Sequence, residues 1–257
     1  MNVNRVARLI PLFLSAATAS VYAEPVLWES DFGTEITDLT GQDDGFTSYD
    51  LDFTFTFAGE AYTDGWISSN GAIALGGLGL TYTYPGGSTF ISTSDPMVAP
   101  FWSDLSLEPK GRVYQNNLAG RAVFTWEDAA SFINSEASFT FQLQLLADGT
   151  IIFGYNGIDP VEGNLDTELM VGLSGGVLND FPPEVNYTDG VVGPTESTVY
   201  ERFTASPAEV FDLDQMNIVF TPVGDQYAVA TITAIPEPTA IGLSLLGIGC
   251  LITRRRG

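Results

Sequence analysis

Residues 138–153 read Ser-Phe-Thr-Phe-Gln-Leu-Gln-Leu-Leu-Ala-Asp-Gly-Thr-Ile-Ile-Phe. Four apolar side chains in this stretch alternate with three polar ones: Phe139, Phe141, Leu143 and Leu145, against Thr140, Gln142 and Gln144. Because successive side chains of a strand point to opposite faces, this alternation predicts a strand with one face in a core and the other in water. Asp148-Gly149 tolerates the positive φ of a tight turn, and an apolar run resumes at residue 151, so we expect a β-hairpin.

The same alternation recurs along the chain, separated by Gly, Asp, Asn and Pro. Leu51 to Phe57 places its apolar residues on one face and Asp or Thr on the other. Further candidate strands are Gly65–Ser68, Gly71–Leu75, Arg112–Tyr114, Arg121–Trp126, Leu169–Leu173 and Asn217–Thr221. Helical periodicity nowhere exceeds two turns between the chain ends. We therefore predict an all-β, antiparallel β-sandwich of eight or more strands over residues 24–223, followed by a linker over 224–235.

Charge is distributed unevenly along the 257 residues. Five of the 9 basic residues lie at the two ends, and all but one of the 32 acidic residues lie between them. Residues 24–235 therefore carry a net charge of about −27. Such a surface repels nucleic acid and anionic lipid head groups, so any membrane attachment must come from an apolar segment.

The chain has no histidine, and its one cysteine, Cys250, lies in the C-terminal apolar run. Ser-His and Cys-His catalytic pairs, imidazole zinc sites and a disulfide in the body are therefore excluded. Carboxylate, lysine and hydroxyl chemistry remain open. We assign no catalytic, cofactor-binding or metal-binding residue and expect a protein that is not an enzyme.

The N-terminus has the layout of a secretory signal peptide over residues 1–23. Arg5 and Arg8 precede the apolar stretch Leu9 to Ala17, and small residues end at Ala23, after which we expect cleavage. The general secretion machinery would then export the chain. The alternative, a permanent anchor helix, is disfavoured by Pro11 and by the short apolar core.

The C-terminus, residues 236–257, combines three features in a fixed order. Pro236-Glu237-Pro238 hold the backbone extended, 239–253 are apolar, and Arg254, Arg255 and Arg256 follow. We expect a helix over the apolar residues 239–253. At 1.5 Å per residue it would be about 22 Å long, which is short of a hydrocarbon core of about 30 Å. The span is therefore marginal, as suits a transient anchor, and the arginines would stay cytoplasmic.

This order resembles the PEP-CTERM sorting signal of Gram-negative bacteria. The resemblance implies an exosortase as processing partner, an intermediate anchored in the inner membrane, and removal of the tail. The final location would be the cell envelope or the extracellular polysaccharide matrix. The alternative is an ordinary stop-transfer helix, which would leave a permanent inner-membrane protein facing the periplasm.

Part of the body, roughly Phe53 to Gly176, resembles the nidogen-like extracellular domain known as NIDO. The matching stretches are Ile67–Ile73, Ala99–Asp104, Arg121–Glu127, Phe141–Leu145 and Asp148–Thr150, with Phe153 and Tyr155. The resemblance implies an adhesive or matrix-associated module without catalytic activity. Exopolysaccharide or other surface proteins are the partners that this reading suggests.

Several acidic residues invite a calcium-binding interpretation. Asp104 follows Phe101-Trp102, and Asp43-Asp44-Gly45 and Asp148-Gly149 supply carboxylate oxygens. None has the repeated Asp spacing with a distal Glu of an EF-hand, so we interpret them first as turns. We expect Trp102 to lie in the core.

The alternative function is that of a carbohydrate-active protein, either lectin-like or a glycosidase with two carboxylates. Glu127-Asp128 and the pair Asp212 and Asp214 are close in sequence, whereas a glycosidase needs carboxyl groups about 5–9.5 Å apart on either side of a sugar. Aromatic residues of the stretch 76–96 could stack on sugar rings if they are exposed: Tyr82, Tyr84 and Phe90. We prefer the reading as a non-enzymatic surface or matrix protein.

Overall fold

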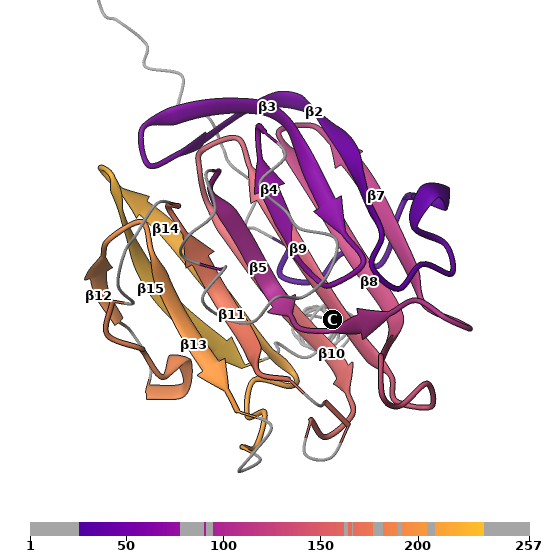
Figure 1. Cartoon of the computed structure of the whole chain (residues 1–257). Coiled ribbons are helices and arrows are strands. Elements are labelled where there is room, and N and C mark those ends of the chain that lie inside the picture. The colour runs from indigo at the N-terminus through magenta and orange to yellow at the C-terminus, as the bar shows by residue number, and fades with distance from the viewer. Residues whose placement is uncertain are drawn as a thin grey trace, which may run out of the picture.

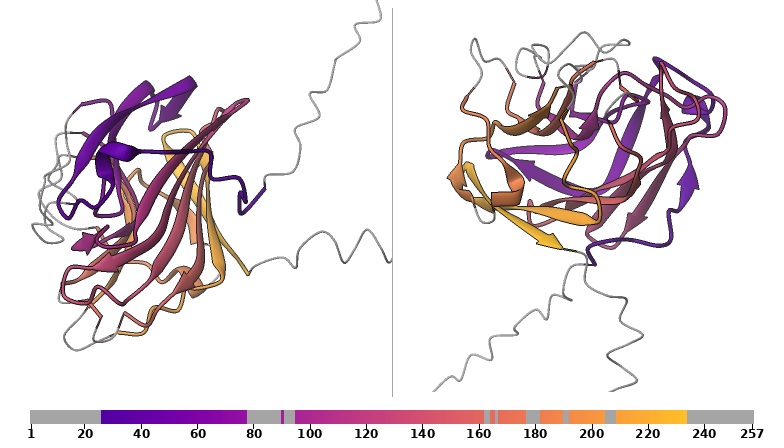
Figure 2. Two further views of the ribbon diagram at one scale, coloured as in Figure 1. Left: turned by 90° about the vertical axis from the view of Figure 1, so that its right-hand side faces the viewer. Right: turned by 90° about the horizontal axis from the view of Figure 1, so that it is seen from below.

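The computed structural model describes residues 26–77, 90, 95–161, 164–165, 167–176, 182–189, 192–204 and 209–233. Within these residues two antiparallel sheets pack face to face, as Figures 1 and 2 show. The predicted all-β sandwich is confirmed. The expected signal peptide, 1–23, and the expected C-terminal helix lie outside the described residues.

Nine of the described strands form the larger sheet. In spatial order they are β1 (Thr34–Glu35), β7 (Arg112–Leu118), β8 (Arg121–Ser131), β9 (Phe139–Leu146), β10 (Ile151–Ile158), β14 (Met216–Val223), β15 (Gln226–Thr233) and β12 (Val192–Thr195), with β6 (Leu105–Ser106) beside β8. Most neighbours are joined by hairpins, so consecutive strands pair and the alternating pattern of each is kept in register.

The smaller sheet contains six of the described strands. In spatial order they are β13 (Val199–Phe203), β11 (Leu169–Ser174), β5 (Met97–Trp102), β4 (Ile73–Leu75), β3 (Glu60–Ser68) and β2 (Phe46–Phe57). Two short 3₁₀ turns, η1 (Thr37–Leu39) and η2 (Tyr187–Asp189), lie in the connections.

Aromatic rings fill the space between the sheets. Phe101 of the smaller sheet stacks on Phe141 of the larger one, with ring centroids 5.0 Å apart. Trp126 stacks on the same ring at 5.1 Å, and its indole N–H donates to the carbonyl of Ser68 across the core. Every second side chain of a strand points into this layer and is removed from water. The apolar residues therefore alternate along each strand.

The hairpin predicted at Asp148-Gly149 is present. Leu145 of β9 lies opposite Ile151 of β10, and Gly149 adopts the positive φ, +88°, that the turn requires. Each of the other predicted segments contains a strand. In Leu51 to Phe57 the Asp and Thr side chains are exposed and Phe55 and Phe57 are buried, as the pattern predicts.

Two expectations are wrong. Residues 224–235 were expected to be a linker, but Gln226–Thr233 form β15, which pairs with β14 along its whole length and buries Tyr227 and Val229. Gln142 and Gln144 were expected to face water, yet both are buried. They are covered because another segment of the chain crosses the outer face of the larger sheet.

Candidate functional site

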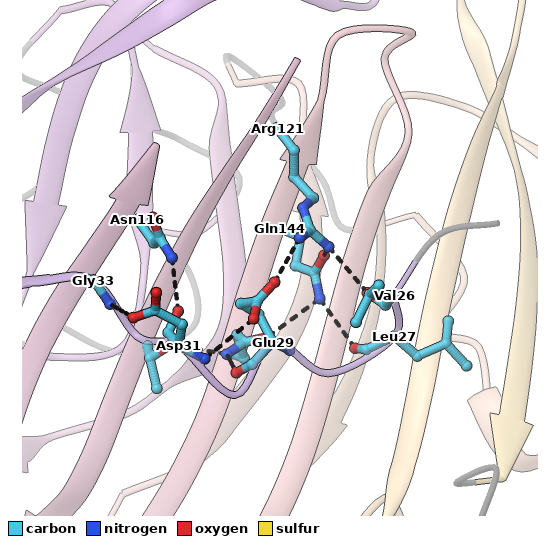
Figure 3. Close-up of polar contacts among 10 residues, drawn as sticks. Val26, Leu27, Glu29, Asp31, Gly33, Asn116, Arg121 and Gln144 are labelled. Carbon is cyan, nitrogen blue, oxygen red and sulfur yellow. Dashed lines mark hydrogen bonds and ion pairs between the residues drawn. The ribbon is translucent and has the colours of Figure 1, made fainter. Parts of the chain in front are cut away.

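That segment is the N-terminal strap, which we define as residues 26–33. It crosses the outer face of the larger sheet before the chain enters β1 at the edge (Figure 3). Gln142 anchors it twice: its side-chain oxygen accepts from the N–H of Glu29 at 2.8 Å, and its amide nitrogen donates to the Glu29 carbonyl at 3.0 Å. Gln144 donates to the carbonyl of Leu27 at 3.1 Å. The two glutamine side chains thus form the hydrogen bonds to the strap backbone that a neighbouring strand would otherwise form.

An ion pair reinforces the strap. The guanidinium group of Arg121 in β8 lies 2.6 Å from the carboxylate of Glu29, and it also donates to Gln144 at 3.1 Å. Toward β1, Asn116 donates to the carbonyl of Asp31 at 2.7 Å. Three strands therefore hold the strap through side chains.

The Asn70-Gly71 turn sits at the junction of the two sheets. The side chain of Asn70 donates to Asp44 at 3.2 Å and accepts from the N–H of Leu105 at 2.8 Å. Gly71 has φ +80°, and a Cβ built on it would lie 2.0 Å from the carbonyl oxygen of Phe101. The turn is therefore a close backbone contact that only glycine permits.

Asp43 lies beside this turn, and one of its carboxylate oxygens is buried without a hydrogen-bond partner. Burial raises the pKa of Asp43, and the neighbouring charges of Asp44 and Glu108 raise it further. Asp104 lies in the bend between β5 and β6. In the described part of the chain, no group of three or more His, Cys, Asp or Glu residues is placed to hold a metal ion.

A cavity of about 560 Å³ opens beside β13. It is lined by five acidic residues, one arginine, one asparagine and three apolar residues. The acidic residues are Glu184, Asp189, Glu201, Glu209 and Asp212. They come from three separate segments: the one that precedes and includes η2, β13 itself, and the chain that leads into β14.

Glu201 is the most deeply placed of these carboxyl groups, at 6% exposed. Its oxygen Oε2 accepts a hydrogen bond from the backbone N–H of Tyr187 at 3.0 Å. Burial raises the pKa of Glu201 to about 7, the charges of Asp212, Glu184 and Asp189 add to the rise, and the Tyr187 N–H opposes it. A carboxyl group with this pKa exchanges its proton near neutral pH.

The sequence model of one protein family, described as NIDO related, matches residues 16–222, well over half of the chain. This chain belongs to the NIDO-related family. No curated protein and no solved structure matches it significantly. As a NIDO-related protein, it carries an extracellular domain of the kind found in secreted or surface proteins.

The stretches of sequence that resemble NIDO contact one another in this NIDO-related domain. The Asn70-Gly71 turn and the Pro100 to Trp102 strand touch each other, and the hydroxyl of Tyr155 donates to the carbonyl of Pro100 at 2.7 Å. The hydrogen bond from Tyr155 to Pro100 joins the larger sheet to the smaller one. Trp102 is buried, as expected.

The residues of each carboxylate pair noted in the sequence have different hydrogen-bond partners. Glu127 accepts from the hydroxyl of Tyr114, and Asp128 accepts from Ser138. Asp214 accepts from two backbone N–H groups at the end of β10, whereas Asp212 lines the cavity. Only Asp212 of the four therefore lies in the acidic cavity.

Phe90 is not available to stack on a sugar ring. It is fully buried and packs 6.1 Å from both Trp102 and Tyr200, on the face of the smaller sheet that points away from the core. Tyr82 and Tyr84 lie outside the described residues.

Sequence reasoning missed Glu201, although a signal was present. Val199, Glu201 and Phe203 share the inward face of β13 by simple alternation. A glutamate at an inward position between two core residues marks a buried acid, which proteins rarely place without a partner.

The residues expected to take part in sorting lie outside the described residues: Ala23, Pro236, Glu237, Pro238, Arg254, Arg255 and Arg256. Over the residues that the structure describes, no helix is long and apolar enough to cross a membrane. The apolar segment 239–253 is not among them.

Proposed function

We propose that this NIDO-related protein is exported through its signal peptide and held briefly at the inner membrane by its C-terminal helix. An exosortase then removes the tail after recognising Pro236-Glu237-Pro238. The mature protein serves as a non-enzymatic adhesive or structural component of the cell surface or of the extracellular polysaccharide.

One observation carries this proposal: both ends of the described chain leave the sandwich on the same side. Figure 2 shows the start of the strap and the end of β15 on the side of the larger sheet. A Cβ built on Gly154 of β10 would lie 3.1 Å from the ring of Trp28. Gly154 is opposite Asn217 in β14, and Asn217 is opposite Ile232 in β15.

This closeness supports attachment to one membrane at both ends. A signal peptide and a C-terminal anchor each deliver the body to the same outer surface of the inner membrane. Because both connections leave from one face, the domain can fold fully while either is intact. Residues 24–235 carry a net charge of about −27, so the acidic body would be repelled by anionic lipid head groups and would remain solvated.

The test is intact mass spectrometry of the native protein combined with subcellular fractionation. We expect a chain that begins at Glu24, lacks Arg254 to Arg256, and is found in the envelope or the medium. The triple substitution Pro236→Ala, Glu237→Gln, Pro238→Ala should retain the tail and hold the protein in the membrane fraction. Asp225→Asn, which removes one charge in the exposed β14–β15 turn, should be processed like wild type.

A mature wild-type species that keeps Arg254 to Arg256 in the membrane fraction would contradict sorting and favour a permanent anchor. Adhesion is tested separately, by retention of the purified protein on exopolysaccharide from the producing cells. Absence of such retention, with normal processing, would remove the adhesive role and leave the sorting proposal standing.

The carbohydrate-active alternative has one specific observation in its favour. Glu201 and Asp212 line the same cavity, and the carboxyl group of Glu201 exchanges its proton near neutral pH. A glycosidase of this kind would release reducing sugar from the polysaccharide and lose that activity in Glu201→Gln. Binding without release supports the adhesive function.

A further inference from the structure

One side of the larger sheet is built from strands without charge. Five adjacent strands, β9, β10, β14, β15 and β12, contain no charged residue. The body that contains them, residues 24–235, carries a net charge of about −27. In the smaller sheet β4, β5 and β11 also lack charged residues, but every side chain in them is buried. The uncharged strands of the larger sheet differ because part of their outer face meets solvent.

Alternation shows which side chains of β14 and β15 form this outer face. Ile218 and Phe220 of β14 lie in the core, as do Tyr227 and Val229 of β15. Their neighbours along each strand therefore point outward. We define the uncharged face by the outward residues that are half-buried or exposed: Val219, Thr221, Ala228, Ala230 and Ile232.

The strap borders the uncharged face and does not cover it. The ring of Trp28 lies over Gly154 of β10, where a Cβ would be 3.1 Å from it. Gly154 is opposite Asn217 of β14, and Asn217 is opposite Ile232 of β15, which is still only half-buried. Trp28 is itself half-buried at this border. Tryptophan is enriched where proteins meet the head groups of a bilayer.

The charged residues of the strap lie over the other strands of the larger sheet. Glu29 pairs with Arg121 of β8, and Asp31 is held through its carbonyl by Asn116 of β7. Both strands are on the far side of β9 from β14 and β15. The strap therefore leaves the uncharged face without a carboxylate.

The C-terminal tail begins close to this face. β15 ends at Thr233, directly after Ile232, and the apolar stretch of the tail begins at Thr239. The five residues between them, 234–238, span at most about 20 Å when fully extended. The eight-residue strands of this face are about 26 Å long. A chain anchored through 239–253 therefore holds its domain within about one strand length of the bilayer.

The side from which the chain leaves decides which surface is turned to the bilayer. The start of the strap and the end of β15 both lie on the side of the larger sheet (Figure 2). A tether this short turns that side toward the membrane. The exposed carboxylates of the smaller sheet, such as Asp52 of β2 and Asp64 of β3, then point away from anionic head groups.

We propose that the uncharged face lies against the surface of the bilayer while the C-terminal helix anchors the chain, an orientation that rests on the proposed membrane-anchored intermediate. Contact through this face removes apolar side chains from water and brings no carboxylate against the lipid phosphates. Contact through the smaller sheet would bring several. Removal of the tail frees the domain, because a small apolar surface without a tether holds a bilayer only weakly.

The test is spin labelling of the anchored chain, without its signal peptide, in phosphatidylcholine vesicles. Cys250→Ser removes the native thiol, and Ala230→Cys or Val219→Cys places a single label on the uncharged face. Thr54→Cys, at an exposed position of β2 in the smaller sheet, is the matched control. The quantity measured is the collision rate of each label with a water-soluble nickel complex. Each rate is compared with that of the same label on a chain that ends at Ile235.

The collision rate should fall by about twofold or more for the labels at Ala230 and Val219, because head groups shield them, and should stay unchanged at Thr54. Equal changes at all three positions would overturn the proposed orientation. Spin–spin broadening at Ala230 without a loss of collisions would assign the face to a second copy of the chain, and it would also overturn the proposal.

Flotation of the labelled chain with the vesicles separates failure of this contact from failure of the anchor. A chain that floats while the Ala230 and Val219 labels keep their collision rates leaves the anchor standing and overturns the contact. A chain that does not float overturns both. Circular dichroism checks the fold of each variant, and Val219→Cys keeps the test valid if Ala230→Cys does not fold.

Discussion

The guanidinium group of Arg121 lies 2.6 Å from the carboxylate of Glu29 on the outer face of the larger sheet. Each side chain is only 17% exposed, whereas the other strap-side pair, Arg112 with Glu35, is 32% and 34% exposed. Screening by water weakens exposed ion pairs. The Arg121–Glu29 pair should therefore contribute more to stability than the Arg112–Glu35 pair, although both join an arginine to a glutamate. The shielded pair holds the strap in place.

Replacing Arg121 with alanine should lower the free energy of unfolding by about 2–3 kcal/mol, because Glu29 and Gln144 both lose a charged donor. Arg112→Ala should cost less than about 1 kcal/mol. Urea denaturation monitored by tryptophan fluorescence measures both. Equal losses in the two variants would show that the burial of the Arg121 pair does not matter.

Replacing Gln142 with leucine should lower stability by about 1–3 kcal/mol, because the N–H and the carbonyl of Glu29 lose their partners under the strap. Amide hydrogen exchange should accelerate at Glu29 before it does in the hairpin strands. Gln226→Leu, at an exposed position of β15, is the matched control and should leave exchange in the strap unchanged. Unchanged exchange at Glu29 in the Gln142 variant would argue against the anchoring role.

Gly71→Ala should prevent folding or lower stability by more than about 4 kcal/mol. The new Cβ would meet the carbonyl oxygen of Phe101 at 2.0 Å, and the backbone has φ +80°. Gly224→Ala has a similar φ, +67°, with nothing within 4 Å, so it should cost only about 1–2 kcal/mol. Thermal melting of the two variants separates steric contact from backbone strain. Similar melting temperatures would mean that the Asn70-Gly71 turn and β5 can move apart within the smaller sheet.

Glu201→Gln should change how stability depends on pH. In wild type the pKa of Glu201 is about 7 in the folded state and near its ordinary value of 4.5 when unfolded. The stability that this raised pKa represents is present below pH 4.5 and is lost as the pH rises through 7. The variant should therefore lose less stability than wild type between pH 4.5 and pH 8, by about 1–2 kcal/mol after allowance for water in the cavity.

Denaturant titrations at pH 5 and pH 8 measure this difference. Glu136→Gln, an exposed carboxylate in the β8–β9 turn, is the control and should follow wild type at both values. Parallel curves for wild type and Glu201→Gln would show that the carboxyl group titrates at an ordinary pKa.

The alternation of side chains and the residue types of turns are local features of the chain. The sequence by itself therefore determined the strands and turns that depend only on them. Leu51 to Phe57 and the hairpin around Gly149 could be predicted because side-chain direction in a strand repeats every two residues. The β-sandwich could be inferred from these strands, because the apolar faces of many half-buried strands must pack against each other to be removed from water. β15 was missed because its small residues, Ala228 and Ala230, weaken the same signal.

Only the tertiary structure decided what covers the outer faces and which charges meet. Gln142 and Gln144 look like water-facing residues until the strap, more than a hundred residues earlier in the chain, is placed over them. Glu201 and Asp212 line one acidic cavity because two separate segments of the chain pack beside β13. Contacts of this kind depend on how distant segments pack, and neither residue type nor periodicity in one segment records its distant partner.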